Sequence, residues 1–205
     1  MTSTTTTAPD IPQMRGVLRF DPLPDETNII LQSVPRSPGL HLSSILKALD
    51  RDLHGAYHKA GGFNLNLCAD IGFTWERVIE IAYKSMVGLR PGEIEKDGVL
   101  MSPDGIGEDP LGIVPFTVHE YKCWFRSTRR TPMHDWYVIM QNMCYCHAMG
   151  TTVGVFRVLY LVGDSWQDGP KYKQWRIEYD PAEMELAWQM VIRNKALGTV
   201  EEGKK

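Results

Sequence analysis

The 205-residue chain has no long hydrophobic run, no excess of positive charge and only four cysteines. No apolar stretch approaches the roughly 20 residues of a transmembrane helix. No basic segment leads into an apolar one near the N-terminus, so we expect neither a membrane anchor nor a signal peptide. The 22 Lys and Arg residues against 25 Asp and Glu residues give a net charge of −3. This balance argues against a protein that holds nucleic acid by bulk electrostatics alone, but it permits one that contacts a few phosphates locally.

Length and composition favour one compact domain over residues 13–200, since no internal repeat or long linker divides them. Residues 1–12 are rich in Thr and poor in large apolar side chains, which predicts a disordered lead, and residues 201–205 predict a solvated tail. Cysteines in a chain without an export signal are expected to be reduced thiols, here Cys68, Cys123, Cys144 and Cys146. We therefore expect a cytoplasmic protein.

Hydrophobic periodicity predicts four helices and four strands. The predicted helices cover about 42–57, a stretch from an N-cap at Thr74 to just before Arg90, about 135–149, and a last helix capped by Asp180 through about 197. The predicted strands are 98–106, 115–125, 153–162 and 174–179. This order predicts an α/β (α+β) fold, in which helices flank a central mixed β-sheet.

The most informative residues are Asp104, in a Gly- and Pro-containing segment, and the triplet Glu120, Tyr121 and Lys122. Side chains alternate along a strand, so Glu120 and Lys122 project on one side and Tyr121 on the other. If the two strands pair, Asp104 meets Glu120 at the end of the hairpin, and two carboxylates converge with an ammonium group. Hard divalent cations such as Mg²⁺ prefer oxygen ligands and keep several waters. A neighbouring ammonium orients such a water, helps to deprotonate it and stabilises charge that develops on a phosphate.

A purely structural interpretation of these residues stays open. Asp104 would then serve a turn before Gly105, while Glu120 and Lys122 would pair on a solvated strand face. For an isolated Glu-Xaa-Lys triplet this is the commoner case, and the preceding Pro-Asp on an adjacent predicted strand shifts the balance towards a metal site.

Three further residues have a functional and a structural interpretation. Gln141 and Tyr145 are four residues apart, hence on one face of the predicted helix over 135–149, and both carry groups that can meet a phosphate or a nucleotide. In the structural interpretation Tyr145 is a core aromatic and Gln141 an exposed helix former. Glu76 lies near the start of the second predicted helix, where an acidic residue is also favourable on electrostatic grounds alone.

In order and spacing, these motifs resemble those of the PD-(D/E)xK nuclease superfamily: Glu76, Pro103-Asp104, Glu120-Tyr121-Lys122 and Gln141 to Tyr145. The Gln-Xaa-Xaa-Xaa-Tyr element is similar to that of the RecB-like and lambda-exonuclease-like branches. The segment from Trp175 to Trp188 is similar to the ending of phage-borne members. The resemblance covers about residues 40–195. It implies a restriction-endonuclease-like nuclease core in a phage-borne protein of the host bacterial cytoplasm.

The resemblance also implies a metal site. Asp104 and Glu120 would bind Mg²⁺, for which Mn²⁺ would substitute, with the main-chain carbonyl of Tyr121 as a further ligand. Lys122 would act on the attacking water. Glu76 would support a second metal ion or the water shell of the first.

Contacts to DNA are implied as well. Gln141 and Tyr145 would position the DNA strand or Lys122, and the Tyr145 ring would stack on or wedge beside a terminal base. Three arginines that follow the second predicted strand would hold phosphates at the mouth of the site, unless they form only a solvated loop: Arg126, Arg129 and Arg130. A weaker set has the same interpretation: Lys171, Lys173 and Arg176. His41 and Ser43 begin the first predicted helix, where RecB-like members often carry a short polar motif. His41 is expected to cap the helix or to pack rather than to bind a ligand.

Some RecB-like nucleases bind an iron–sulfur cluster through four cysteines, but the spacing here does not match that pattern. Cys144 and Cys146 fall on one predicted helix and point about 200° apart, so they cannot readily share one cluster. No iron–sulfur cluster is expected.

The sequence therefore predicts a Mg²⁺-dependent deoxyribonuclease, preferably an exonuclease in recombination or DNA end processing. One alternative is an endonuclease on the same fold, and another is a DNA-binding or regulatory module without catalysis. A structural protein of a phage particle would leave the convergence of Asp104, Glu120 and Lys122 unexplained. The near-neutral charge suggests that a homo-oligomer encloses the DNA or that a recombination partner delivers it.

Overall fold

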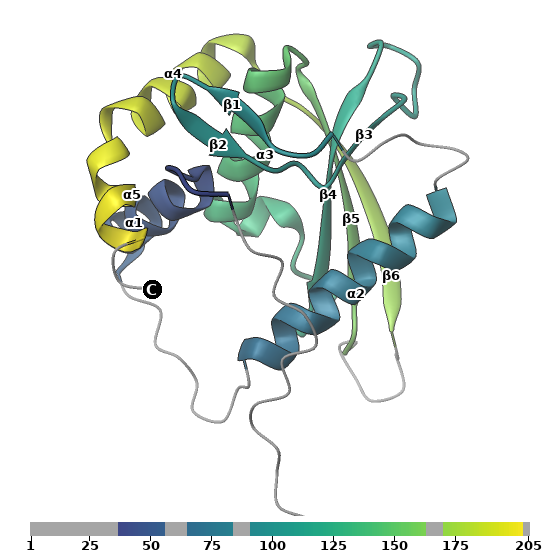
Figure 1. Ribbon diagram of the computed structural model, residues 1–205. Helices are drawn as coiled ribbons and strands as arrows, with labels where there is room; N and C mark the ends of the chain where they lie inside the picture. Colours follow the sequence, from purple (N-terminus) through teal and green to yellow (C-terminus); the bar gives the residue numbers. More distant parts are fainter. Residues whose placement is uncertain (1–36, 56–64, 84–90, 163–169, 203–205) are drawn as a thin grey trace, which may run out of the picture.

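The fold is built on a four-stranded mixed sheet and a separate two-stranded hairpin (Figure 1). The computed structural model describes residues 37–55, 65–83, 91–162 and 170–202. The larger sheet has the order β3-β4-β5-β6, with strands Gly105–Gly107, Thr117–Trp124, Val153–Tyr160 and Lys171–Glu178. β4 and β5 run parallel, whereas β3 and β6 pair antiparallel with their neighbours. The predicted mixed sheet is confirmed.

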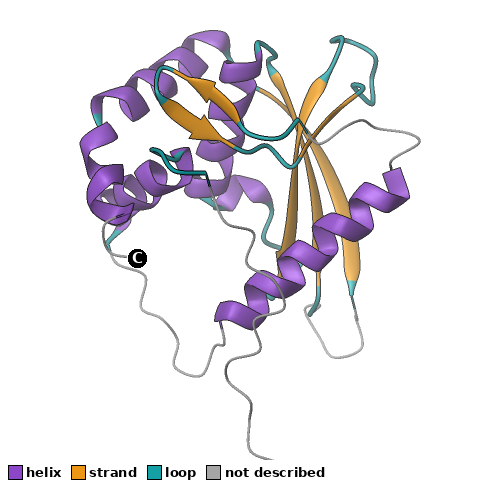
Figure 2. Ribbon diagram, viewed as in Figure 1, coloured by secondary structure: helices purple, strands orange, loops and turns teal. Residues whose placement is uncertain are grey.

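Helices cover both faces of this sheet (Figure 2). They are α1 (Leu42–His54), α2 (Leu65–Tyr83), α3 (Trp136–Met149), α4 (Pro181–Arg193) and α5 (Lys195–Glu202), with a 3₁₀ turn at Pro132–His134. α2 packs against β4 and sets Trp75 edge-on to Tyr172 of β6, with the ring centroids 5.8 Å apart. α3 lies on the other face, where Val138 packs against Phe156 and Val158. α1 and α4 pack on α3, and α5 packs on α1.

Two helix starts follow their sequence signals. The Asp135 side chain accepts a hydrogen bond from the Val138 amide at 3.4 Å and so caps α3, which ends at Gly150 in the left-handed conformation. The Asp180 carboxylate accepts one from the Ala182 amide at 2.7 Å and caps α4. The predicted cap at Asp180 is confirmed, and the helix predicted over about 135–149 begins one residue later than expected because Asp135 is its cap. α3 fixes the face on which Gln141 and Tyr145 stand.

The predicted start of the second helix is wrong. α2 already begins at Leu65, and Thr74 lies within it. The Thr74 hydroxyl donates to the Asp70 carbonyl at 2.8 Å, four residues earlier, so its polar group is satisfied without ending the helix. Glu76 consequently lies in the middle of α2. The predicted end of this helix falls in 84–90, outside the described residues.

The predicted strand over 98–106 is in fact two strands in different sheets. β2 (Val99–Met101) pairs with β1 (Ile94–Lys96), which the sequence analysis missed, whereas β3 pairs with β4. Pro103 has no amide hydrogen to donate and interrupts the ladder between them. The chain changes sheets at this point, which places Asp104 at the junction.

Other boundaries differ from the prediction at the two ends of the chain. α1 ends at His54 with Gly55 as its C-cap, three residues before the predicted end, and Leu53 in its last turn is exposed. The last predicted helix divides at Asn194, whose side-chain amide donates to the Met190 carbonyl at 2.8 Å and satisfies a helix-terminal acceptor. α5 then continues to Glu202. The predicted disordered lead and residues 203–205 lie outside the described residues.

The four cysteines are free thiols, as expected, and those of Cys144 and Cys146 are buried. Burial raises the pKa of Cys144 to about 12. In the described part of the chain, no helix is both long and apolar enough to cross a membrane.

We expect Gly154→Ala in β5 to destabilise the protein by about 2–4 kcal/mol. A Cβ at this position would lie 1.8 Å from Oδ1 of Asn142, a fully buried residue of α3. Asn142 would have to leave its hydrogen bonds to the Tyr179 hydroxyl, at 2.9 Å, and to the Val118 carbonyl, at 3.5 Å. Urea denaturation measures the change.

The matched control is Gly72→Ala, because Gly72 lies inside α2 with nothing within 4 Å of an added Cβ. This substitution should stabilise the protein by about 0.5–1 kcal/mol through helix propensity. Equal effects of the two substitutions would contradict the described packing of α3 on β5.

Candidate active site

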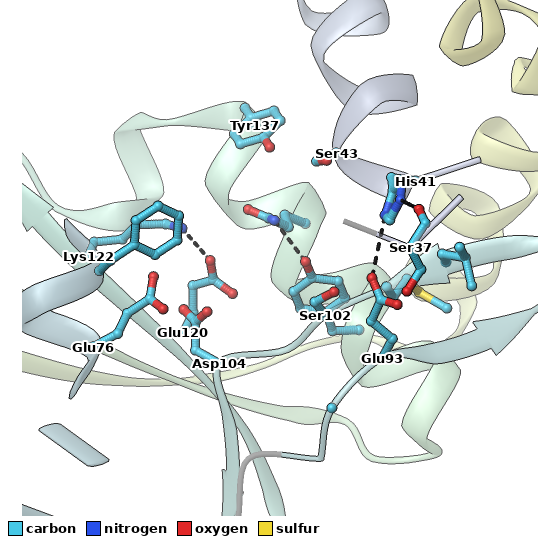
Figure 3. Close-up of a pocket in the computed structure, with 16 residues that line it drawn as sticks. Ser37, His41, Ser43, Glu76, Glu93, Ser102, Asp104, Glu120, Lys122 and Tyr137 are labelled. Carbon is cyan, nitrogen blue, oxygen red and sulfur yellow. Dashed lines mark hydrogen bonds and ion pairs between the residues drawn. The ribbon is translucent and has the colours of Figure 1, made fainter. Parts of the chain in front are cut away.

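A pocket of about 670 Å³ opens between the start of α1, α2, β4, α3 and the segment that follows β2 (Figure 3). Apart from two tyrosines, the ionisable side chains that line it are those of His41, Glu76, Glu93, Asp104, Glu120 and Lys122. Glu76, Asp104, Glu120 and Lys122 gather at one end, and His41 and Glu93 lie at the other. Asp104 and Glu120, which the sequence predicted to converge, thus line the same pocket.

Asp104 is held against the edge of β4 by a main-chain hydrogen bond. β3 pairs with β4 only as far as His119, so the amide of Tyr121 is available and donates to Asp104 Oδ2 at 2.7 Å. The N–H and C=O groups of one strand residue point to the same edge, so the Tyr121 carbonyl also faces the side on which Asp104 lies. A Cβ at Gly105 would lie 2.7 Å from the Tyr121 hydroxyl, so a glycine is needed at this close approach.

Glu120 and Lys122 project on the same side of β4, as the strand alternation predicted. The Lys122 ammonium donates to Oε1 of Glu120 in a close ion pair. Glu120 is only 2% exposed, and its second oxygen, Oε2, is buried with no hydrogen-bond partner. The Tyr121 side chain lies on the opposite face beside the ring of His119, at 6.3 Å between centroids. A buried carboxylate oxygen without a donor is costly, and its presence in a pocket indicates a binding role.

The electrostatics of this pair favour a neutral or metal-bound Glu120. Burial raises the pKa of Glu120, Lys122 opposes that rise, and the carboxylates of Asp104 and Glu76 add to it. Burial by itself would lower the pKa of Lys122, but Glu120 and Asp104 outweigh it and raise that pKa. Lys122 is therefore protonated at neutral pH, so it is a positively charged hydrogen-bond donor.

Glu76 reaches the same end of the pocket from α2. Its carboxylate lies beside Glu120 and Lys122 (Figure 3) and contributes to the raised pKa of Glu120. The structure therefore brings three carboxylates, from α2, from the β2–β3 junction and from β4, to the same end of the pocket as Lys122 (Figure 3). Such a group of acids is expected where a cation binds.

Gln141 and Tyr145 face the pocket from α3, as their spacing predicted. The Gln141 amide donates to the Tyr145 hydroxyl at 2.8 Å, and Gln141 Oε1 is buried without a partner. Tyr145 is 3% exposed, and its pKa is raised, first by burial and then by Glu120 and Asp104, so it is a neutral phenol. A ring this buried offers little surface to a terminal base, and the predicted stacking of Tyr145 stays a prediction.

The predicted DNA-binding arginines lie outside the lining of this pocket. Arg126 binds Asp135 at 2.7 Å and stacks over Trp124, while Arg129 and Arg130 are exposed in the following loop. Their contact with phosphates stays a prediction. In the weaker set, Arg176 donates to Asp109 at 2.8 and 3.1 Å and lowers the pKa of that carboxyl, a structural role. Lys173 donates to the Thr128 carbonyl at 3.0 Å, while Lys171 stands on β6.

The structure adds lining residues that the sequence analysis missed. His41, which the sequence predicted to cap or pack, is the buried N-cap residue of α1 without a side-chain cap hydrogen bond, and its Nε2 lies 2.9 Å from the Ser37 carbonyl and its Nδ1 4.0 Å from Glu93. Tyr137 of α3 also lines the pocket and adds to the raised pKa of Lys122. The remaining lining residues include Phe73, Ser102 and the predicted Ser43. Tyr137 lies four residues before Gln141, so helical spacing was the signal that could have found it.

The donor set fits a hard divalent cation. Asp104, Glu120 Oε2 and the Tyr121 carbonyl are all oxygen donors, and the chemistry suits Mg²⁺ or Mn²⁺ better than softer metals. Within the described part of the chain, no three His, Cys, Asp or Glu side chains already stand together as a ready-made metal site. One oxygen of Glu120 is engaged by Lys122, so Oε2 is the oxygen of Glu120 that is open to a cation.

No protein-family model and no curated protein matches this chain. Among solved structures, the protein SSO0001 is 15% identical over 80% of this chain and 79% of its own, with a TM-score of 0.47. The alkaline exonuclease LHK-Exo from Laribacter hongkongensis is 17% identical over 80% of this chain and 90% of its own, with a TM-score of 0.46. The structure of LHK-Exo in complex with dAMP is 17% identical over 81% of this chain and 89% of its own, with a TM-score of 0.48. At these values the similarities carry no functional information, and the activity has to be inferred from the site itself.

Proposed function

We propose that the protein is a metal-dependent DNA nuclease of the PD-(D/E)xK type that hydrolyses phosphodiester bonds. The observation that carries the proposal is the unpartnered Oε2 of buried Glu120, in a pocket that also holds Asp104 and the ammonium of Lys122. A structural ion pair on a solvated strand face would leave neither oxygen buried and unsatisfied.

The side chains have separate roles in the proposed reaction. Asp104, Glu120 and the Tyr121 carbonyl would hold Mg²⁺, with Glu76 supporting a second ion or its water shell. When bound, the metal supplies an acidified water and neutralises charge on the phosphate. The Lys122 ammonium orients the attacking water and stabilises the negative charge that grows on the phosphoryl oxygens. Because its pKa is raised, Lys122 acts in this role as a charged donor rather than as a base.

The finer assignment is a DNA exonuclease that acts in recombination or end processing. The pocket supports it, because four of its six ionisable lining residues other than tyrosine are carboxylates and the described basic residues Arg126 and Arg176 are engaged by Asp135 and Asp109. A protein with this charge distribution has few contacts for clasping duplex DNA at internal positions. An oligomer or a recombination partner that brings DNA ends to the site belongs to the same proposal.

The choice of metal tests the proposal. Mg²⁺ and Mn²⁺ should support DNA hydrolysis, whereas Ca²⁺ should bind and support less than about a hundredth of that rate, since it polarises water less and coordinates loosely. Titration calorimetry gives the binding, and release of acid-soluble nucleotides gives the rate. Asp104→Asn is the matched control for binding, since it removes the charge and keeps the shape.

A wild-type protein that binds none of these ions, alone or with DNA, would contradict the nuclease and favour a DNA-binding module without catalysis. Ca²⁺ as effective as Mg²⁺ would contradict the proposed role of the metal-bound water.

A further inference from the structure

Phe73 is the most exposed aromatic residue among those that line the pocket. It is 47% exposed, whereas Tyr137 is half-buried and Tyr145 only 3% exposed. Phe73 lies three residues before Glu76 on α2, so both side chains point to the same side of the helix. A phenyl ring that is nearly half exposed thus lines the pocket on the same helix as Glu76.

Packing of α2 against the sheet, as far as the described residues show it, does not explain this position. The residues of α2 that turn towards the sheet are different ones, since Ile79 is buried and Trp75 meets Tyr172. The ring lines a pocket whose walls combine carboxylates and hydroxyls with the apolar side chains of Leu100 and Met101, and 47% of Phe73 stays exposed there. A half-exposed aromatic ring in such a pocket is suited to a flat ligand with a π-surface.

The size and charge of the pocket narrow the class of ligand. Pockets of roughly 300–1,000 Å³ hold one small ligand, so a pocket of about 670 Å³ holds a nucleotide or two of a single strand rather than a duplex. Glu76, Glu93 and Asp104 repel phosphate groups that no metal neutralises. Affinity for the strand must therefore come in part from its bases.

We infer that Phe73 forms a base-binding subsite, in which its ring stacks on an unpaired nucleobase next to the phosphate under attack. This rests on the proposed nuclease function and adds a substrate class to it: a single-stranded end, or a duplex end that has come apart by a nucleotide or two. Stacking depends weakly on base identity because every base has a π-face. The subsite gives affinity for a base without sequence specificity.

The test compares wild type with Phe73→Ala on oligonucleotides that carry either a normal base or an abasic residue at the terminal nucleotide. Base–aromatic stacking accounts for roughly 5- to 150-fold in affinity. Wild type should prefer the normal end by that factor in KM, with kcat little changed. Phe73→Ala should show no preference, and Phe73→Tyr should restore it. Val78→Ala is the control, since Val78 is 48% exposed on the same helix and does not line the pocket.

A second measurement separates the subsite from catalysis. A terminal 2-aminopurine should lose fluorescence on binding to wild type in Ca²⁺ but not on binding to Phe73→Ala. Equal quenching and equal abasic discrimination by the two proteins would overturn the inference, even if both cleave DNA. If wild type quenches the probe and never cleaves in Mg²⁺, the subsite stands and the nuclease proposal fails. A wild type without quenching or discrimination overturns the subsite.

Discussion

Asp104→Ala, Glu120→Ala and Lys122→Ala should each reduce DNA hydrolysis to below about a thousandth of the wild-type rate, because each removes a metal ligand or the cation beside it. Asp104 and Glu120 supply the carboxylate oxygens, and Lys122 supplies the only ammonium among the described residues that line the pocket. The rates are measured on linear duplex DNA in Mg²⁺, with circular dichroism melting of each variant as the check on folding.

The conservative variant Glu120→Gln separates a functional acid from a structural one. Burial raises the pKa of Glu120, so its ionised form costs stability as pH rises above the ordinary glutamate pKa of 4.5. Glutamine removes that cost and still accepts from Lys122. We therefore expect Glu120→Gln to be inactive and to melt no lower than wild type at pH 8 without metal, with the difference vanishing near pH 4.

If the variants of Asp104, Glu120 and Lys122 unfold, or if the three alanine variants all retain activity, these residues are structural. If Lys122→Ala loses activity while Asp104→Ala and Glu120→Ala keep it, the metal site is contradicted and only Lys122 takes part in the reaction.

Digestion should depend on DNA ends, with a linear duplex degraded at least about 100-fold faster than the same plasmid closed and relaxed. A closed circle offers no unpaired end to a pocket that holds only a nucleotide or two. With a net charge of −3, the protein also has little attraction for the middle of a duplex. Acid-soluble nucleotides are followed over time. The control is a singly nicked circle, in which one strand has ends and the other strand is continuous.

Equal cutting of the closed circle into discrete fragments would contradict the exonuclease and promote the endonuclease on the same fold. If substitution of Arg126, Arg129 and Arg130 abolishes cutting at internal sites but leaves digestion from ends unchanged, those arginines bind the duplex.

Much of the site could be predicted because its residues lie close together in sequence and on regular elements. The alternation of a strand places Glu120 and Lys122 on one side, and the spacing of a helix places Gln141 and Tyr145 on one face. The structure shows both arrangements. The short connection between β3 and β4 brings Asp104 to the same edge, since antiparallel neighbours need only a loop.

What could not be predicted depends on tertiary packing. Thr74 has the composition of an N-cap, yet a bond to the Asp70 carbonyl satisfies it inside α2. The burial of Tyr145 and the exposure of Phe73 depend on how α3 and α2 stand against the sheet, which no local pattern encodes. The short strand β1 exists only through its pairing with β2.

The most direct measurement is hydrolysis of linear DNA by wild type and by Lys122→Ala, in Mg²⁺, after addition of EDTA, and after Mg²⁺ is restored. The account predicts that wild type releases nucleotides in Mg²⁺, stops in EDTA and resumes with Mg²⁺, while folded Lys122→Ala releases none throughout. Hydrolysis by wild type that continues in EDTA, or that folded Lys122→Ala matches, would contradict a metal-dependent nuclease centred on Asp104, Glu120 and Lys122.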